Sequence, residues 1–346
     1  MSDKVRVGLI GCGNIGAGGH APAYLSVSGV ELVAACDILP GRAEAVARLT
    51  GATAYQDYRE VLARPDVDAV DLCLPTDQHA SVAIEALRAG KHVLCEKPIA
   101  RTLAEADAMI AAAREAGRVL MVGHVRRFDH RYTAIREALR AGEVGRPVYL
   151  RRAERQWLPF PADVWYWRPE AGGGVILDIG VHIADLFRWY LEDEPVSVYA
   201  VGRQVRRAAR EANSFDHALM TFHFRNGAIG VAEASWAYQP NYGGALYAEL
   251  DVVGTAGKIH YSDRDTNPLL IYDAEEGAIL PRYFRFMSTT EYAFQAEIGH
   301  FVECVRTGRS PSISPEDARA ALEMALAAQR SAETGKPVAF SLEEAP

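Results

Sequence analysis

The segment VRVGLIGCGNIG near the start of the chain constrains the fold more than any other part of the sequence. A short apolar run ends in Gly11, Gly13 and Gly16, and an amphipathic segment follows. In a strand, loop and helix arranged in this way, Gly11 permits the tight turn, Gly13 lets the backbone approach a pyrophosphate, and Gly16 allows close packing of helix on sheet. We therefore expect a Rossmann domain whose dinucleotide-binding turn also contains Asn14 and Ile15.

The same alternation of short apolar runs and amphipathic segments continues to about residue 122. Strands are expected at 5–10, 30–36, 68–74, 92–96 and 118–123. Helices are expected between them, and the helix over 102–116 opens with a capping-box sequence. Continuous apolar strands separated by helices indicate a parallel sheet that is covered on both faces.

The pattern changes after residue 123. A helix is expected over 129–142, and several segments of alternating polarity follow, with hairpin turns at Asn226-Gly227 and at 254–257. A last helix is expected to begin at Ser314-Pro315 and to end at Gly335. We therefore predict an α/β domain over residues 1–122 and an α+β domain with a mostly antiparallel sheet over residues 123–346.

The composition limits the classes of partner. The formal net charge is −8 and no run of Lys or Arg forms a stripe, so we expect no nucleic-acid partner. We expect no membrane insertion either, because no apolar stretch approaches the length of a membrane helix and the first residues lead into a strand without a signal-peptide region. The five cysteines form no Cys-x-x-Cys pair, which suits reduced thiols in the cytoplasm.

An acidic residue, Asp37, follows the second expected strand, about where a Rossmann domain holds the adenosine ribose. Its carboxylate would accept hydrogen bonds from a free 2′-hydroxyl and would repel a 2′-phosphate, which favours NAD over NADP. Arg42 is near enough in the sequence to soften that repulsion. The alternative is a surface acid that simply follows a strand.

Two polar segments, LPTDQHA and CEKPIA, follow the third and fourth of these strands. Ligands of open α/β sheets bind outside the carboxyl ends of the strands, so both segments are candidates for the site. Lys97 precedes a proline, which holds its backbone extended and allows a cis peptide. Taken alone, Lys97 could equally be an ordinary surface lysine.

Three polar residues interrupt the apolar helix GGGVILDIGVHIADLF. Asp178 and His182 are four residues apart and Asp185 follows one turn later, so helical spacing places them on one face. A helix-stabilising pair and a functional site both fit this pattern. We expect no metal centre, because the sequence shows no second close group of His or Cys that would complete one.

In their order and spacing, these motifs resemble the Gfo/Idh/MocA family of nicotinamide-dependent oxidoreductases. The likeness rests on the glycine fingerprint, EKP at 96–98, GHVRRFDHRY at 123–132, YWRPEAGGGVILDIGVHIADL at 166–186 and ELDVVGTAGKIH at 249–260. It covers nearly the whole chain. Each motif is modest alone, and the ordered combination is what is specific.

The resemblance implies a Rossmann domain that binds NAD, followed by an open-faced sheet domain that binds substrate and forms homodimers or homotetramers. The implied substrate is a polyol, inositol or sugar, held between the two domains. The family's catalytic lysine maps onto Lys97, and its Asp-x-x-x-His pair maps onto Asp178 and His182. His182 would then be the general base, Asp178 would orient it or the hydroxyl, and Lys97 would donate to the reacting oxygen.

The resemblance also implies further binding residues. Those beside the cofactor are Leu74, Pro75, Thr76, His79, Glu96 and Lys97, although His79 could equally cap its helix. Arg127, Trp167 and Arg168 would frame the nicotinamide and the substrate, although each alone could be an interdomain ion pair or a core aromatic. Trp167 belongs to a group of five aromatic residues over 157–167, which suits either a sugar ring or an oligomer interface.

Two departures from the family pattern bear on cofactor binding. Leu74 stands where the family often has Thr or Ser. Gly18 and Gly19 follow the fingerprint and could loosen the first turn of its helix.

Three alternatives keep the same fold. They are an NADP-linked reductase of a sugar ketone or imine, an enzyme that forms a 3-keto-glycoside, and a non-catalytic NAD-sensing regulator. A sensor would have no chemical need for Lys97, Asp178 and His182 together.

Overall fold

The computed structural model describes residues 4–157, 159–238, 246–263, 269–273, 277–279 and 289–340. The chain divides into two compact units, Met1–His130 with Phe286–Arg319 and Arg131–Arg285 with Ala320–Pro346. The sequence places its boundary after residue 122 and does not anticipate that a late segment returns to the first unit. That return brings helix α9 (Thr289–Thr307) to the Rossmann sheet.

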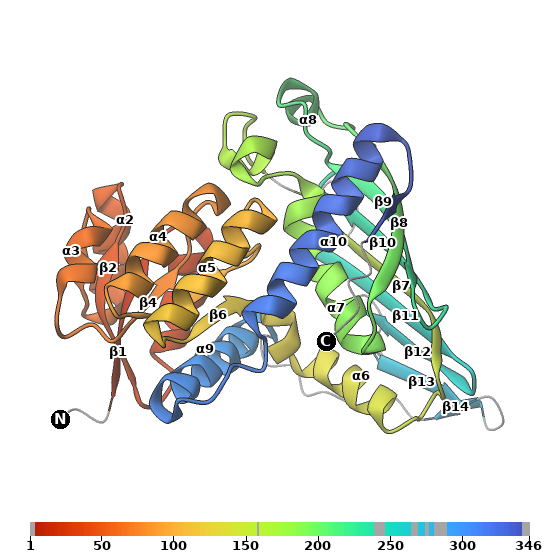
Figure 1. The fold of residues 1–346 in the computed structure, drawn as a ribbon, viewed down its shortest axis with the longest axis horizontal. Helices are drawn as coiled ribbons and strands as arrows, with labels where there is room; N and C mark the ends of the chain where they lie inside the picture. Colours follow the sequence, from red (N-terminus) through yellow and green to blue (C-terminus); the bar gives the residue numbers. More distant parts are fainter. Residues whose placement is uncertain are drawn as a thin grey trace. The chain divides into compact units, whose positions relative to one another are not determined.

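The first unit is built on a parallel sheet with helices on both faces (Figure 1). Its described strands are β1 (Val5–Ile10), β2 (Val30–Cys36), β3 (Thr53–Tyr55), β4 (Ala69–Leu72), β5 (His92–Glu96) and β6 (Leu120–Gly123). Its other described helical segments are η1 (Gly16–His20), α1 (Ala21–Tyr24), α2 (Pro40–Thr50), α3 (Tyr58–Ala63), α4 (Thr76–Arg88), α5 (Leu103–Ala116) and η2 (Val125–Phe128). The described strands pair in the order β3-β2-β1-β4-β5-β6, all parallel, which confirms the predicted sheet and places its switch point between β1 and β4.

Alternation along β1 sends successive side chains to opposite faces of this sheet. Val7 and Leu9 pack in an apolar cluster with Phe294 and Ile298 of α9. Gly8 points the other way, where a Cβ would lie 2.5 Å from a methyl group of Val61 on α3. The apolar pattern of the strand therefore predicts the buried sheet, whereas the identity of the helix that covers one face depends on a segment far along the chain.

The second unit is built on a mixed sheet. Its strands are β7 (Pro147–Gln156), β8 (Pro195–Arg203), β9 (His217–Phe224), β10 (Ile229–Ser235), β11 (Leu246–Gly254), β12 (Gly257–Ser262), β13 (Leu269–Asp273), β14 (Gly277–Ile279) and β15 (Val338–Ala339). The described strands pair in the order β14-β13-β12-β11-β7-β10-β9-β8-β15. Only β7 and β10 pair in parallel among them, so the predicted mostly antiparallel sheet is confirmed.

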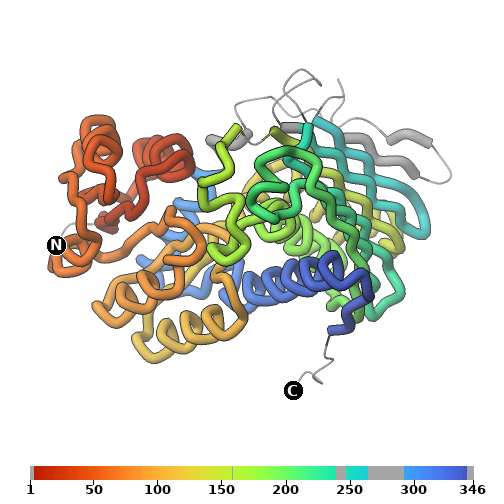
Figure 2. Tube along the Cα trace, turned by 90° about the horizontal axis from the view of Figure 1, so that it is seen from above, coloured from red at the N-terminus to blue at the C-terminus, as the bar shows by residue number. Residues whose placement is uncertain are grey.

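Helices line one face of this sheet, as Figures 1 and 2 show. The helical segments of the unit are α6 (His130–Arg140), η3 (Trp165–Trp167), η4 (Pro169–Ala171), η5 (Ile176–Gly180), α7 (Val181–Leu191), α8 (Arg207–Glu211) and most of α10 (Pro315–Thr334). In β8, Val198 and Ala200 are buried while Tyr199 and Val201 are exposed, as expected for a strand with one covered face. The Ser331 hydroxyl of α10 accepts the N–H of Ala200 over 2.9 Å and so ties that helix to the sheet.

Local signals predicted several of these boundaries. The capping box at Thr102 and Glu105 is present, and the Ser314 hydroxyl accepts the N–H of Asp317 at the start of α10. Gly227 has φ 84° in the turn between β9 and β10, so the Asn226-Gly227 hairpin is confirmed. The pairing of β11 with β12 confirms the other predicted hairpin.

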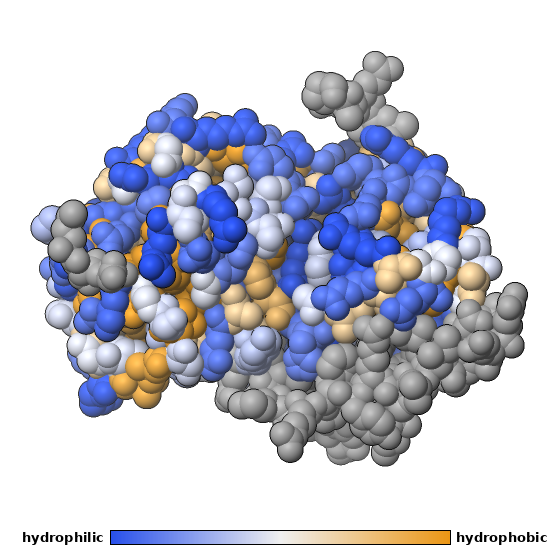
Figure 3. All heavy atoms as spheres, turned by 90° about the horizontal axis from the view of Figure 1, so that it is seen from below, coloured by the Kyte–Doolittle hydropathy of each residue, from blue (hydrophilic) through white to orange (hydrophobic). Residues whose placement is uncertain are grey.

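The molecular face seen in Figure 3 is largely hydrophilic, with small separate patches of apolar residues. Within the described part of the chain, no helix combines the length and the apolarity that crossing a membrane requires.

Candidate active site

The glycine turn after β1 has the geometry that its sequence predicts. Gly11 has φ 98°, and a Cβ there would overlap the carbonyl oxygen of Cys73. A Cβ at Gly16 would overlap the carbonyl oxygen of Gly11, so both positions require glycine for packing. A Cβ at Gly13 would meet no described atom within 4 Å. The backbone at Gly13 is therefore open to a bound group, and this opening fits a dinucleotide pyrophosphate.

The rest of this turn differs from a regular helix start. Asn14 and Ile15 are exposed beside the opening, and residues 16–20 form a π-helical turn. A Cβ at Gly19 would lie 2.8 Å from the ring of Phe294, so this glycine lets α9 pack against the turn. Gly18 has no described atom near its Cβ position. Both extra glycines lie in the π-helical turn, and Gly19 has a packing role.

Asp37 lies at the carboxyl end of β2 and is fixed by the backbone. Its Oδ2 accepts the N–H of Cys12 over 2.9 Å, and its Oδ1 accepts the N–H of Leu39 over 2.9 Å. A carboxylate offers about four lone-pair sites, so acceptor capacity remains for a ribose hydroxyl. Ile38 and Leu39, which follow it, are exposed apolar residues that the sequence reasoning did not single out.

The loop after β4 leads into α4, whose first residue is Thr76. Pro75 is the N-cap residue and, like Leu74, is half-buried. The ring nitrogens of His79 lie 2.9 Å from the carbonyl oxygens of Leu74 and Pro98, and burial lowers the pKa of this histidine. His79 therefore joins the loop after β4 to the loop after β5, and a direct contact with a cofactor stays a prediction.

Glu96 and Lys97 lie at the carboxyl end of β5. The peptide bond between Lys97 and Pro98 is cis, an isomer that the sequence allowed for. Glu96 is buried, and its Oε2 accepts the backbone N–H of Lys97 over 3.1 Å. Because β1, β2, β4 and β5 run parallel, their carboxyl ends bring Gly13, Asp37 and Lys97 to the same edge of one sheet.

The glycines at 172–174 form the bend that precedes the polar helix of the second unit. Gly172 and Gly174 have φ 80° and 101°, and a Cβ at Gly173 would overlap the carbonyl oxygen of Tyr166. The N–H of Gly174 donates to this same oxygen over 2.8 Å. The chain can therefore fold back on itself before the helix begins.

Asp178 and His182 lie at the start of this helix, which begins as the π-helical turn η5 and continues as α7. Asp178 is half-buried, while His182 and Asp185 are buried. A Cβ at Gly180 would be 3.3 Å from Met220, so the turn packs closely on β9. The sequence predicted a regular helix here. The wider π turn, a feature often found at functional sites, carries no signal in residue spacing alone.

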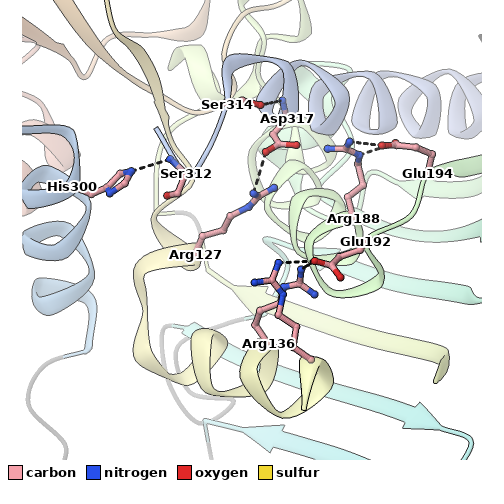
Figure 4. A network of polar contacts seen from close by, with 10 residues as sticks. Arg127, Arg136, Arg188, Glu192, Glu194, His300, Ser312, Ser314 and Asp317 are labelled. Carbon is pink, nitrogen blue, oxygen red and sulfur yellow. Dashed lines mark hydrogen bonds and ion pairs between the residues drawn. The ribbon is translucent and has the colours of Figure 1, made fainter. Parts of the chain in front are cut away.

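Two of the other three predicted substrate residues have structural partners. Arg127 in η2 is buried, and its Nη1 lies 3.3 Å from Oδ2 of Asp317, within the first unit (Figure 4). The ring of Trp167 is fully buried, donates to the carbonyl of Phe160 over 3.2 Å and lies edge-on to Trp236. Trp167 is thus a core aromatic, one of the alternatives that the sequence left open. Arg168 is exposed.

The aromatic neighbours of Trp167 stack on one another. The rings of Trp165 and Tyr166 are 4.1 Å apart, and those of Phe160 and Tyr166 are 5.2 Å apart. The guanidinium of Arg206 lies 3.6 Å from the ring centre of Trp157. Packing within the unit therefore accounts for much of this group.

Sequence reasoning missed a buried group in the first unit, which we call the His20 cluster. Its members are His20, Tyr24, Asp71, Glu96 and Glu297. The available signal was Asp71, a charged residue inside an otherwise apolar strand. Glu297 gave no comparable signal, because only the fold brings α9 to this place.

Residues 5–124 match the family described as GFO_IDH_MocA, an oxidoreductase family with an NAD-binding Rossmann fold. Residues 132–260 match the GFO/IDH/MocA C-terminal domain.

Relatives and solved structures are similar over nearly their whole length. The scyllo-inositol 2-dehydrogenase (NAD(+)) of Bacillus subtilis is 34% identical over 349 residues, covering 100% of this chain and 99% of the relative. The myo-inositol 2-dehydrogenase of Thermotoga maritima is 32% identical and covers 96% of this chain and 98% of the relative. The structure of GenD2 from gentamicin A biosynthesis, in complex with NAD, has a TM-score of 0.86 at 27% identity and covers 99% of this chain and 97% of that one.

Proposed function

The chain belongs to the Gfo/Idh/MocA family of oxidoreductases, and from this membership we propose that it is an NAD-dependent dehydrogenase of a polyol, inositol or sugar-like substrate. The reaction interconverts a secondary hydroxyl group and a ketone. The observation that carries this proposal is the full-length similarity to the scyllo-inositol and myo-inositol dehydrogenases. The open backbone at Gly13 and the polar residues along the same sheet edge support it.

Residues of the first unit would bind the cofactor. The proposed set is Gly11, Gly13, Asn14, Ile15, Gly16, Asp37, Leu74, Pro75, Thr76, His79, Glu96 and Lys97. The carboxylate of Asp37, already fixed by two backbone N–H groups, would accept the ribose hydroxyls and disfavour a 2′-phosphate. The exposed side chains of Ile38 and Leu39 would cover the adenine beside it.

Lys97, Asp178 and His182 would carry the chemistry. NAD held by the residues of the first unit would supply the hydride acceptor for the carbinol carbon. His182 takes the hydroxyl proton, since an imidazole titrates near neutral pH. Asp178 orients His182 or the hydroxyl group, and the Lys97 ammonium stabilises the negative charge that develops on the oxygen.

The proposed substrate residues differ in how directly they can act. Arg168 is exposed and free to contact a ligand, whereas Trp167 would act by supporting the polypeptide around it. Arg127 would act from its ion pair with Asp317.

The protein would assemble as a homodimer or homotetramer through the uncovered face of the second sheet. Tyr199, Val201 and Leu219 are exposed on this face, and an exposed apolar patch is typical of such an interface. A cytoplasmic location is supported by the cysteines, which all lie in the described part of the chain and form no disulfide.

The test is an assay of turnover that monitors the absorbance of reduced nicotinamide. Purified protein is incubated with NAD or NADP and with inositols, aldoses, ketoses and glycosides. Oxidation of at least one polyol or sugar with a preference for NAD is expected. Binding of NAD without turnover of any polyol or sugar would contradict the proposed substrate class.

A further inference from the structure

His20 lies between two carboxylates in the interior of the first unit. Its Nδ1 is 2.7 Å from Oδ2 of Asp71, and its Nε2 is 3.1 Å from Oε1 of Glu96. A carboxylate can only accept hydrogen bonds, so both ring nitrogens must donate if both acids are ionised. Burial alone would lower the pKa of His20, but the charges and hydrogen bonds of Asp71 and Cys73 together outweigh it, and the net pKa is well above its usual value. The ring is therefore an imidazolium.

The carboxylate of Glu96 contacts both His20 and the backbone of Lys97. Oε1 faces His20 and Oε2 accepts the backbone N–H of Lys97, so one carboxylate joins the π-helical turn after Gly16 to the end of β5. A Cβ at Gly123 would lie 3.0 Å from Oε1. The glycine that ends β6 thus leaves room for the carboxylate in this position.

The cluster is closed from two further sides. The Tyr24 hydroxyl donates to Oδ2 of Asp71 over 2.9 Å. Glu297 comes from α9, is fully buried, and finds no hydrogen-bond partner among the described residues for either carboxylate oxygen. Burial raises the pKa of Glu297, and the negative charge of Glu96 raises it further. A neutral Glu297 keeps the cluster from holding three carboxylates against the single positive charge of His20.

We propose that Glu96 is a positioning residue for Lys97, and that the imidazolium of His20 holds it in place. The cluster thereby couples the dinucleotide-binding turn to the lysine. This inference rests on the catalytic role proposed above for Lys97. Glu96 does no chemistry itself, and its effect on the reaction passes through the placement of its neighbour.

A double-mutant cycle tests this coupling. The rate of hydride transfer is measured in single turnovers for the wild type, Glu96→Gln, Lys97→Ala and the double variant. The glutamine keeps the shape of Glu96 but loses the charge that pairs with His20. We expect Glu96→Gln to slow hydride transfer about 10-fold to 100-fold, the scale associated with small misplacement of a catalytic group. In the Lys97→Ala background the same substitution should change the rate less than twofold.

Two further variants serve as a control and as a substitute. Glu303→Gln removes a partly exposed carboxylate, 3.7 Å from Arg309, from the same helix as Glu297 and controls for general effects of charge loss. If Glu96→Gln does not fold, as judged by circular dichroism, His20→Gln replaces it in the cycle, because it removes the other charge of the His20–Glu96 pair.

The outcomes distinguish failure of the proposed coupling from failure of the proposed role of Lys97. Equal slowing in both backgrounds would show that Glu96 acts independently of Lys97 and would overturn the inference. One equivalent of a divalent metal in the purified wild type would also overturn it, since His20, Glu96 and Glu297 come close enough to hold an ion that would replace the imidazolium. A Lys97→Ala variant with the wild-type rate would instead refute the proposed role of Lys97.

Discussion

The carboxylate of Asp37 accepts the backbone N–H of Cys12 over 2.9 Å, so the acid that ends β2 also holds the turn that follows β1. The carboxyl ends of the parallel strands β1 and β2 are thereby linked by a hydrogen bond before any ligand binds. The proposed preference for NAD depends on this arrangement.

Asp37→Ala is therefore expected to weaken NADH binding by about tenfold or more, because hydrogen bonds to a charged group contribute roughly 1.5–3 kcal/mol. Binding of NADPH should weaken less, since the repulsion of a 2′-phosphate is removed at the same time. Fluorescence titration with both reduced cofactors measures the two effects. Asp107→Ala, an exposed acid in the same unit, is the control. Equal affinity of the wild type for NADH and NADPH would contradict this role.

The glycines of the fingerprint allow a matched comparison. Gly16→Ala should lower the free energy of unfolding by about 1–3 kcal/mol, because its Cβ would overlap the backbone at Gly11. Gly13→Ala should leave stability nearly unchanged but weaken NADH binding, because its Cβ points into open space. Urea denaturation and cofactor titration on both variants separate the effects. Tight NADH binding by Gly13→Ala would show that the pyrophosphate does not lie there.

The same region shows how far the sequence can predict a structure. Strand, glycines and helix follow one another within a few residues, so their arrangement is set locally and was predicted correctly. The placement of Phe294 against Gly19 was not predictable, because α9 reaches the turn only after the chain has crossed the second unit. Contacts that depend on such distant segments leave no local pattern.

Trp167 and Arg168 are adjacent but should respond differently to substitution. Trp167→Ala should reduce the free energy of unfolding by about 3–5 kcal/mol, because the ring is fully buried against Trp236. Arg168→Ala should keep the stability of the wild type and raise KM for the polyol, because Arg168 is exposed. Thermal denaturation and steady-state kinetics provide the two measurements. An unchanged KM would remove Arg168 from the proposed substrate residues.

The sequence predicts which residues belong to the candidate site better than it predicts their local structure and partners. Spacing alone proposed Asp178 and His182 as one helical face, but it could not reveal that their helix begins with a π turn. The family resemblance proposed His79 as a cofactor contact, and the structure adds that both of its ring nitrogens lie against backbone carbonyls. Motifs therefore identify candidate residues, and the burial and partners of each side chain decide what it can contact.

The His20 cluster should make stability depend on pH. The folded-state pKa values of His20 and Glu297 are raised, so their contributions are fully present at low pH and are lost as pH rises above about 6.5 and 4.5 respectively, the unfolded values. Burial would raise the pKa of Glu96, but His20 lowers it, so the contribution of Glu96 is lost as pH falls. The other ionisable groups around the cluster are Tyr24, Asp71, Cys73 and Lys97.

Glu297→Gln tests this dependence, because it cannot ionise. It should match the wild type in stability near pH 4.5 and exceed it increasingly above that, by up to about 1.4 kcal/mol for each pH unit. Urea denaturation between about pH 5 and 9 gives the comparison. A variant less stable than the wild type at about pH 8 would mean that Glu297 is ionised and paired in the native protein.

The central claim is that Lys97 and His182 carry out NAD-dependent oxidation of a polyol. The most direct measurement is the single-turnover formation of NADH from the best inositol or sugar substrate, with Lys97→Ala and His182→Ala compared with the wild type at equal occupancy by NAD. We predict that each substitution slows hydride transfer at least about 100-fold, the scale typical of a lost general base or oxyanion donor, and that His182→Ala leaves the NADH dissociation constant nearly unchanged. Hydride transfer at the wild-type rate in either variant would contradict the account.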